Sequence, residues 1–210
     1  MTVLNTICNI MQTGTLNIFA NWEIKGKQNV PKNCPLIIVS NHQSNFDSSL
    51  ISVSIPREVR FLAKSEVFQN SISKQLLNWY GAYPLKRGKV DVEAMKWCLE
   101  TLRKKKSLLI YPEGGRSPNK LSRGHSGVAL IALKSMAPIL PMSITGTAHL
   151  HSTARILNPT GNFTVNIGEP FTLDEIPTKP YSKEILANIT QIIMSKIANL
   201  LPESYRGEYA

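Results

Sequence analysis

Four short apolar segments constrain the fold of this chain more than any other feature. They cover residues 36–39, 59–62, 107–111 and 139–144. Segments in which apolar residues recur at helical spacing lie between or after them, at residues 91–104, 125–136 and 182–200. Strands without regular polar alternation are buried on both faces, and their alternation with helices is typical of α/β proteins. We therefore predict an α/β fold with a mixed, largely parallel sheet and helices on both faces.

The chain is expected to form one main domain. Residues 163–167 alternate apolar and polar positions, which predicts a late strand. No internal repeat, low-complexity tract or linker interrupts the pattern, and 210 residues suit one medium-sized domain. We place this domain at residues 23–210.

Residues 1–22 predict a weakly amphipathic helix ahead of that domain. Its apolar positions, among them Leu4, Ile7 and Ile18, recur at roughly helical spacing. Its polar positions are Asn, Thr and Gln, without the Lys and Arg that interfacial helices usually carry. Two interpretations stay open: a helix packed on the domain, or a monotopic contact with a membrane.

The formal net charge of +10 favours anionic partners, which include nucleic acid, anionic lipid surfaces and phosphorylated substrates. An aromatic content of 7% offers few stacking surfaces for single strands, so we expect no nucleic-acid partner. No run approaches the roughly 18 apolar residues that span a bilayer, which makes any membrane contact peripheral or monotopic. The odd, widely spaced cysteines Cys8, Cys34 and Cys98 suggest a reducing cytoplasmic setting and no metal site.

A histidine and an aspartate five residues apart are the first candidates for chemistry. His42 and Asp47 directly follow the apolar segment at residues 36–39, where α/β folds place their sites. On a regular helix this spacing would separate the side chains, so they can meet only across a turn. His42 would then act as a general base and Asp47 would fix its tautomer. The alternative is that Asp47 only caps a helix beginning at residue 48.

Three further segments carry candidate binding residues. Glu113-Gly114-Gly115-Arg116 follows a predicted strand, and its glycines and guanidinium suit an anion. Lys86 and Arg87 end a short strand and could hold the same phosphate. The segment Pro138-Ile139-Leu140-Pro141 could line an acyl chain, or could simply be a buried core strand.

The order of these segments resembles the four sequence blocks of the glycerolipid acyltransferase family. The likeness runs from about residue 22 to about residue 175 and is strongest to bacterial 1-acyl-glycerol-3-phosphate acyltransferases. Asn41, next to His42, and Lys64, in Phe-Leu-Ala-Lys-Ser-Glu, also match and are possible accessory residues. The second block departs from the family pattern, reading Pro84-Leu85-Lys86-Arg87. Gly115 stands where the third block often has threonine.

The resemblance implies a specific reaction at the cytoplasmic face of a membrane. His42 and Asp47 would be the catalytic pair. The acceptor's phosphate would lie against Lys86, Arg87 and the block from Glu113 to Arg116. The block from Pro138 to Pro141 would help to form the acyl or donor site. The acceptor would be lysophosphatidic acid, the product phosphatidic acid, and the donor acyl-CoA or acyl carrier protein, with no other cofactor.

Three alternatives to this reaction stay open. The acceptor could be another lyso-lipid, or water could replace it, which would make the protein an acyl-thioester hydrolase. The net charge is also compatible with a non-enzymatic module that binds anionic membranes or nucleic acid.

Overall fold

The computed structural model describes residues 3–86, 91–173 and 178–210. The strands are β1 (Ala20–Lys25), β2 (Leu36–Ser40), β3 (Val59–Lys64), β4 (Ala82–Leu85), β5 (Ser107–Ile110), β6 (Ile139–Thr145) and β7 (Gly161–Ile167). The helices are α1 (Val3–Phe19), α2 (Asp47–Ser54), α3 (Ser71–Tyr80), α4 (Val92–Arg103), α5 (Gly127–Ser135) and α6 (Lys183–Ala198). Short 3₁₀ turns cover Lys27–Asn29, Ser65–Phe68, Thr153–Ile156, Glu203–Tyr205 and Gly207–Tyr209.

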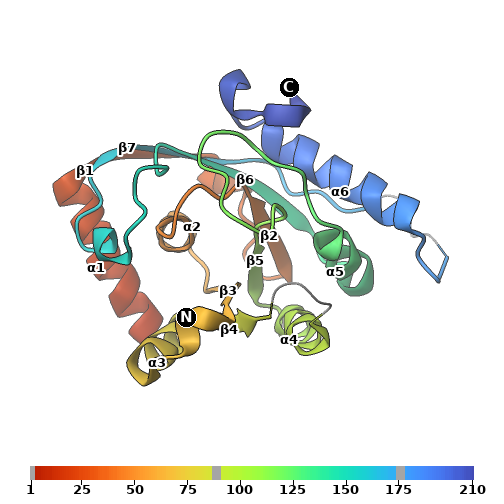
Figure 1. Cartoon of the computed structure of the whole chain (residues 1–210), viewed down its shortest axis with the longest axis horizontal. Helices are drawn as coiled ribbons and strands as arrows, with labels where there is room; N and C mark the ends of the chain where they lie inside the picture. Colours follow the sequence, from red (N-terminus) through yellow and green to blue (C-terminus); the bar gives the residue numbers. More distant parts are fainter. Residues whose placement is uncertain (1–2, 87–90, 174–177) are drawn as a thin grey trace.

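Within the described residues, seven strands form one sheet in the order β1-β7-β6-β2-β5-β3-β4. The pairs on both sides of β2 and β5 are parallel, and the β6–β7 pair is antiparallel. The mixed, largely parallel sheet that the sequence predicts is therefore confirmed (Figure 1). All five residues of β2 are buried, because this central strand has a packed layer on each face.

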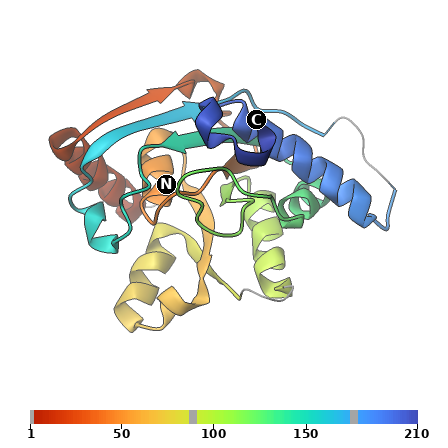
Figure 2. The ribbon, with the colours of Figure 1, turned by 45° about the horizontal axis from the view of Figure 1, so that its top comes forward.

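The two faces of the sheet have separate apolar cores. Leu36, Ile38 and Leu109 face the layer that contains α1, α2 and α3. Ile37 and Val39 face the layer of α4, α5 and α6. In Figures 1 and 2, α1 and α6 accordingly lie on opposite sides of the molecule.

The first helix is shorter than predicted and packs with its polar side inward. It ends at Phe19, and residues 20–22 belong to β1, a strand that the sequence analysis did not anticipate. The Ser49 hydroxyl in α2 donates a hydrogen bond of 2.7 Å to the amide oxygen of Gln12. On the outer side of α1, Val3, Ile10 and Ile18 are 78%, 67% and 73% exposed. The buried residues of α1 are thus Asn5, Gln12 and Leu16, and most of its large apolar side chains are left outside.

Gly146, which follows β6, takes a backbone conformation that side chains rarely adopt. Its φ is +91°, and a Cβ atom placed there would lie 1.9 Å from the Asn162 carbonyl oxygen. The chain can therefore turn at this point, beside β7, only with glycine.

We expect Gly146→Ala to lower the free energy of unfolding by about 2 kcal/mol or more, because it adds backbone strain and a clash. Gly14→Ala is the matched control, since Gly14 lies inside α1 with no atom within 4 Å of an added Cβ. That variant should be neutral or more stable by about 0.5–1 kcal/mol. Urea unfolding of both proteins checks the difference, and equal effects would contradict it.

Candidate functional site

The bend between β2 and α2 brings the predicted histidine and carboxylate together. His42 Nδ1 lies 2.9 Å from Asp47 Oδ2, and the Asp47 side chain is completely buried. Asp47 is the first residue of α2, but its carboxylate turns back to the bend and accepts hydrogen bonds from the backbone N–H groups of Gln43 and Ser44. The alternative that Asp47 only caps the helix therefore does not describe its contacts.

Donors surround both oxygens of the Asp47 carboxylate. Oδ2 accepts from His42, Gln43 and Ser44 at 2.9, 2.6 and 2.8 Å. Oδ1 accepts from the hydroxyls of Ser44 and Thr147 at 2.9 and 2.6 Å. These hydrogen bonds replace the ones that the carboxylate would form with water if it were exposed. Because Nδ1 carries the hydrogen bond to Asp47, the neutral imidazole keeps its proton there, and Nε2 is left to accept a proton.

Thr147 is a residue of the candidate site that the sequence analysis missed. It comes after β6 and lies 100 residues from Asp47 along the chain. Asn41 holds β6 beside β2. Its side-chain amide donates a hydrogen bond to the Ile144 carbonyl oxygen and accepts one from the Ile144 backbone N–H, both at 2.8 Å. Thr147 reaches the site because β2 and β6 are neighbours in the sheet. The sequence held one weak local signal, which is that Thr147 carries a hydroxyl group and follows Gly146 at the end of a strand.

The block from Pro138 to Pro141 lies in the sheet. Ile139 and Leu140 are fully buried in β6, in the two opposite cores. None of the four residues lines the large cavity described below. The structure therefore places the block in a core strand, and its expected contact with an acyl chain stays a prediction without support from the cavity.

Glu113 has a different place from the expected phosphate contact. Its Oε1 accepts a hydrogen bond of 2.8 Å from the backbone N–H of His42, and its Oε2 accepts from the N–H and hydroxyl of Ser122 at 2.8 and 2.9 Å. Burial raises the pKa of this carboxyl above its usual value. Both oxygens are thus engaged inside the protein, and a carboxylate would also repel a phosphate. Glu113 positions the backbone of His42.

An aromatic ring covers one face of the catalytic candidate. The rings of Tyr111 and His42 are stacked, with centroids 3.9 Å apart and an angle of 11° between their planes. The Tyr111 hydroxyl lies 3.1 Å from the Ser48 hydroxyl in α2. Burial raises the pKa of Tyr111 well above its usual value, which favours the neutral phenol.

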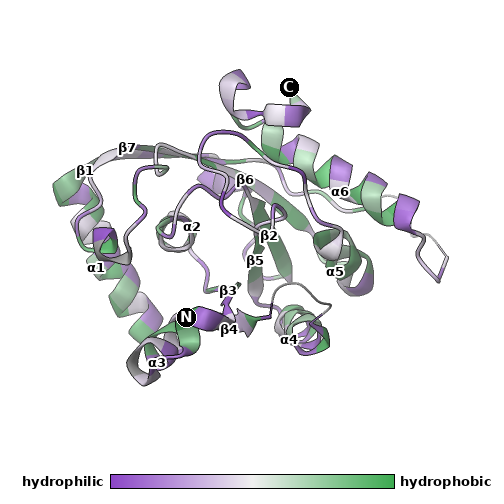
Figure 3. Cartoon of the chain, in the orientation of Figure 1, coloured by the Kyte–Doolittle hydropathy of each residue, from purple (hydrophilic) through white to green (hydrophobic). Residues whose placement is uncertain are grey.

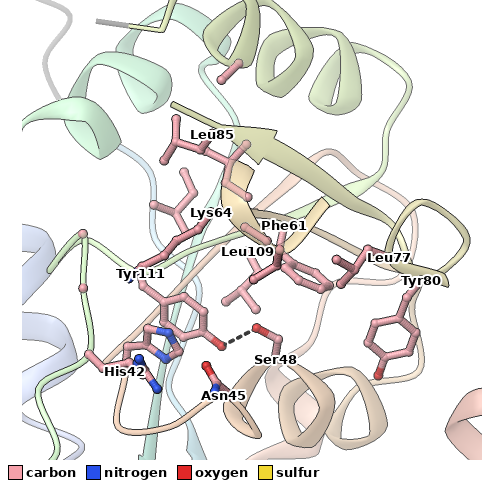
Figure 4. A pocket seen from close by; sticks show the side chains of 18 of the residues that line it. His42, Asn45, Ser48, Phe61, Lys64, Leu77, Tyr80, Leu85, Leu109 and Tyr111 are labelled. Atoms are coloured by element: carbon pink, nitrogen blue, oxygen red, sulfur yellow. Dashed lines mark hydrogen bonds between the residues drawn. The ribbon is translucent and has the colours of Figure 1, made fainter. Parts of the chain in front are cut away.

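These residues lie at the edge of a cavity of about 1650 Å³. One part is walled by apolar side chains of β3, β5 and α3, including Phe61, Leu109 and Leu77, and reaches Tyr80 (Figure 4). Another part extends along α4 and α5, past Cys98 and Ile131. Its volume and lining suit long apolar chains.

Several of the predicted anion-binding residues also line this cavity. They are Gly114, Gly115 and Arg116, and Lys64, a possible accessory residue, is also part of the lining. In the described part of the chain, neither Arg116 nor Lys64 has an ion-pair partner. Lys86 is exposed beyond β4 and is not part of the lining, and Arg87 lies outside the described residues.

The described residues contain no group of three or more His, Cys, Asp or Glu side chains that could hold a metal ion. His149 Nε2 lies 2.7 Å from the Thr160 carbonyl oxygen.

Comparisons with known proteins agree on one family. The family model described as Acyltransferase matches residues 21–145. A chloroplastic 1-acyl-sn-glycerol-3-phosphate acyltransferase of Brassica napus is 32% identical over 158 residues, which are 72% of this chain and 45% of that protein. This chain thus spans somewhat less than half of the plant relative.

Two bacterial proteins are matched over more of their length. The 1-acyl-sn-glycerol-3-phosphate acyltransferase of Bacillus subtilis is 26% identical over 186 residues, covering 88% of this chain and 90% of that protein. The crystal structure of the 1-acyl-sn-glycerophosphate (LPA) acyltransferase PlsC from Thermotoga maritima superposes with a TM-score of 0.71 and 28% identity, covering 94% of this chain and 79% of that one.

We expect Asp47→Asn to destabilise the fold by about 3–5 kcal/mol, because an amide cannot accept from every donor that now surrounds the carboxylate. Glu93→Gln is the control, since Glu93 forms an exposed ion pair with Lys96 and its loss should change stability by less than about 0.5 kcal/mol. Denaturant unfolding at neutral pH measures both. An Asp47→Asn protein as stable as the control would show that the donors do not depend on the carboxylate.

Proposed function

This chain belongs to the acyltransferase family, and from that premise we propose that it transfers a fatty acyl group from a thioester carrier to the free hydroxyl of lysophosphatidic acid. The product is phosphatidic acid, and the donor is acyl-CoA or acyl carrier protein. The observation that carries the proposal is the His42–Asp47 pair at the edge of a large apolar cavity. This cavity is also lined by Arg116 and Lys64, which have no ion-pair partner among the described residues.

The reaction follows from the geometry of the pair. Nε2 of His42 removes the proton of the acceptor hydroxyl as its oxygen attacks the thioester carbonyl carbon. Asp47 stabilises the imidazolium that forms and holds the ring in place through Nδ1. When the tetrahedral species collapses, the carbon–sulfur bond breaks and the thiolate takes the proton from the imidazolium. No protein nucleophile is required, because the acceptor supplies the attacking oxygen.

Charge and shape support a phosphate-bearing lipid as the acceptor. Arg116 and Lys64 line the cavity without an ion-pair partner in the described residues, and a guanidinium matches the geometry of phosphate oxygens. The two apolar parts of the cavity, one along α3 and the other along α4 and α5, offer room for acyl chains. Part of the donor chain, part of the acceptor chain, or both would lie there.

The outer surface of α1 supports a membrane as the place of reaction. Its exposed apolar side chains Ile10 and Ile18 lie on the side turned away from the protein. Hydrophobic colour recurs along the ribbon of α1 (Figure 3). Exposed Leu76 and Trp79 of the neighbouring α3 add further apolar surface. We infer that α1 rests in the interfacial layer of an anionic bilayer, so that the acceptor can enter the cavity from the lipid. No helix in the described ranges is long and apolar enough to cross a membrane.

The first test is release of thiol from labelled acyl-CoA with and without lysophosphatidic acid. We expect release only when the acceptor is present, and a loss of about 100- to 10,000-fold in His42→Ala because the base is removed. His149→Ala is the control, because its ring lies outside the cavity lining.

The outcomes of this assay separate the alternatives. Release without acceptor would make the protein a thioester hydrolase, and no release with either carrier would leave a binding module. A panel with lysophosphatidylglycerol and uncharged monoacylglycerol tests the acceptor. Equal rates with monoacylglycerol and lysophosphatidic acid would contradict the role given to the phosphate.

The second test concerns α1. We expect Ile10→Glu combined with Ile18→Glu to reduce binding to vesicles that contain phosphatidylglycerol by about tenfold or more, because each isoleucine that enters the bilayer contributes about 1.5–3 kcal/mol. The control is Ile192→Glu, which changes an isoleucine of α6 that is 41% exposed on the opposite layer. Co-sedimentation measures binding, and equal losses in both proteins would contradict the docking of α1.

A further inference from the structure

The imidazole of His42 is held on its edge and on its face by two different side chains. The edge is fixed by Asp47, 2.9 Å from Nδ1. The face is covered by Tyr111, whose ring is almost parallel to the imidazole, with 11° between the planes and 3.9 Å between the ring centroids. A hydrogen bond to one atom leaves the ring free to tilt about that bond, whereas a stacked ring opposes the tilt. The two contacts together determine where Nε2 points.

Tyr111 is itself held in place. It follows β5, which is paired with both β2 and β3 in the middle of the sheet. Its hydroxyl lies 3.1 Å from that of Ser48, in the first turn of the helix that begins with Asp47. Figure 4 shows the Tyr111 ring over the His42 ring and the hydrogen bond between the Tyr111 and Ser48 hydroxyls. The ring is thus fixed at both ends relative to the residues that hold His42.

The face of an aromatic ring also attracts a cation. During the proposed reaction the imidazole takes up a proton and becomes positively charged, while its edge stays on Asp47. A ring stacked on the imidazolium stabilises that charge through its π electrons, which an aliphatic side chain of similar size cannot do. The contribution is selective for the state that forms during the reaction, so it acts on the rate rather than on substrate binding.

We propose that Tyr111 is a positioning residue for the acyl transfer, which holds the His42 imidazole in its reactive orientation and stabilises the imidazolium through ring stacking. This inference rests on the function proposed above. It assigns the effect to the ring, with the hydroxyl serving to hold the ring against α2.

The test compares substitutions that keep or remove the ring. Tyr111→Phe keeps the stack and should retain kcat to within about threefold. Tyr111→Leu removes it and should lower kcat by about tenfold or more, with KM changed by less than about threefold. The matched control is Tyr83→Leu, which removes another tyrosine from a stack, with Trp97 at 4.7 Å, outside the cavity lining. Its kcat should stay close to that of the unmodified protein.

A second measurement does not depend on activity. The ring current of Tyr111 should shift the ring-proton NMR signals of His42 upfield, and these signals should move downfield in Tyr111→Leu but far less in Tyr111→Phe. Tyr111→Met, also without a ring, replaces Tyr111→Leu in both measurements if the leucine protein does not fold.

The results distinguish failure of this inference from failure of the proposed function. If the unmodified protein transfers acyl groups and Tyr111→Leu does so equally fast, the role of Tyr111 is overturned and the function stands. Equal losses in Tyr111→Phe and Tyr111→Leu would assign the effect to the hydroxyl and also overturn it. If the unmodified protein transfers no acyl group, the proposed function fails. Independently of activity, unchanged His42 NMR signals in Tyr111→Leu would show that the stack is absent and would overturn the role of Tyr111.

Discussion

The buried carboxylate of Asp47 is the constraint on which the rest of the site depends. An ion removed from water destabilises a protein by several kcal/mol unless donors replace the lost hydration. The bend after β2 supplies three of these donor residues, and Thr147, after β6, supplies another. The carboxylate therefore requires β2 and β6 to end side by side. Their parallel pairing, in which Ile38 lies opposite Leu140, meets this requirement. The apolar strands thus assemble the site as well as the core.

Local patterns explain what could be predicted from the sequence. The central strands are recognisable because burial on both faces leaves them apolar, as in β2 and β6. The His42–Asp47 pair is recognisable because five residues can form a bend. The edge strand β1 escaped prediction since its residues alternate between intermediate and exposed positions. The contacts of Tyr111 and Thr147 escaped it because they depend on which strands are neighbours, and no short segment of sequence contains that information.

The helix α1 shows where a correct periodicity is still insufficient. The spacing of apolar residues predicts a helix with one apolar side, and it does not say which side faces the protein. Here Ser49 and Ser52 of α2 present hydroxyl and carbonyl groups to Gln12 and Asn9, so the polar side of α1 finds its partners inside. A buried polar residue is stable when it is hydrogen-bonded, which makes this arrangement possible. The absence of Lys and Arg on the polar side, which in the sequence weakened the membrane interpretation, has the same cause.

The positions of the charges say more than the net charge of +10 does. Where β3 and β5 begin, Arg60 and Lys106 both lie beside Glu58, so these cations are neutralised within the protein. At the opposite ends of those strands, Lys64 and Arg116 line the cavity, and the described residues provide them with no ion pair. Cations in a cleft with apolar walls attract anions more strongly than the same cations on an open surface. Glu58 therefore neutralises cations where β3 and β5 begin, whereas the two cations beyond the opposite ends of these strands remain available to an anion in the cavity lined by His42.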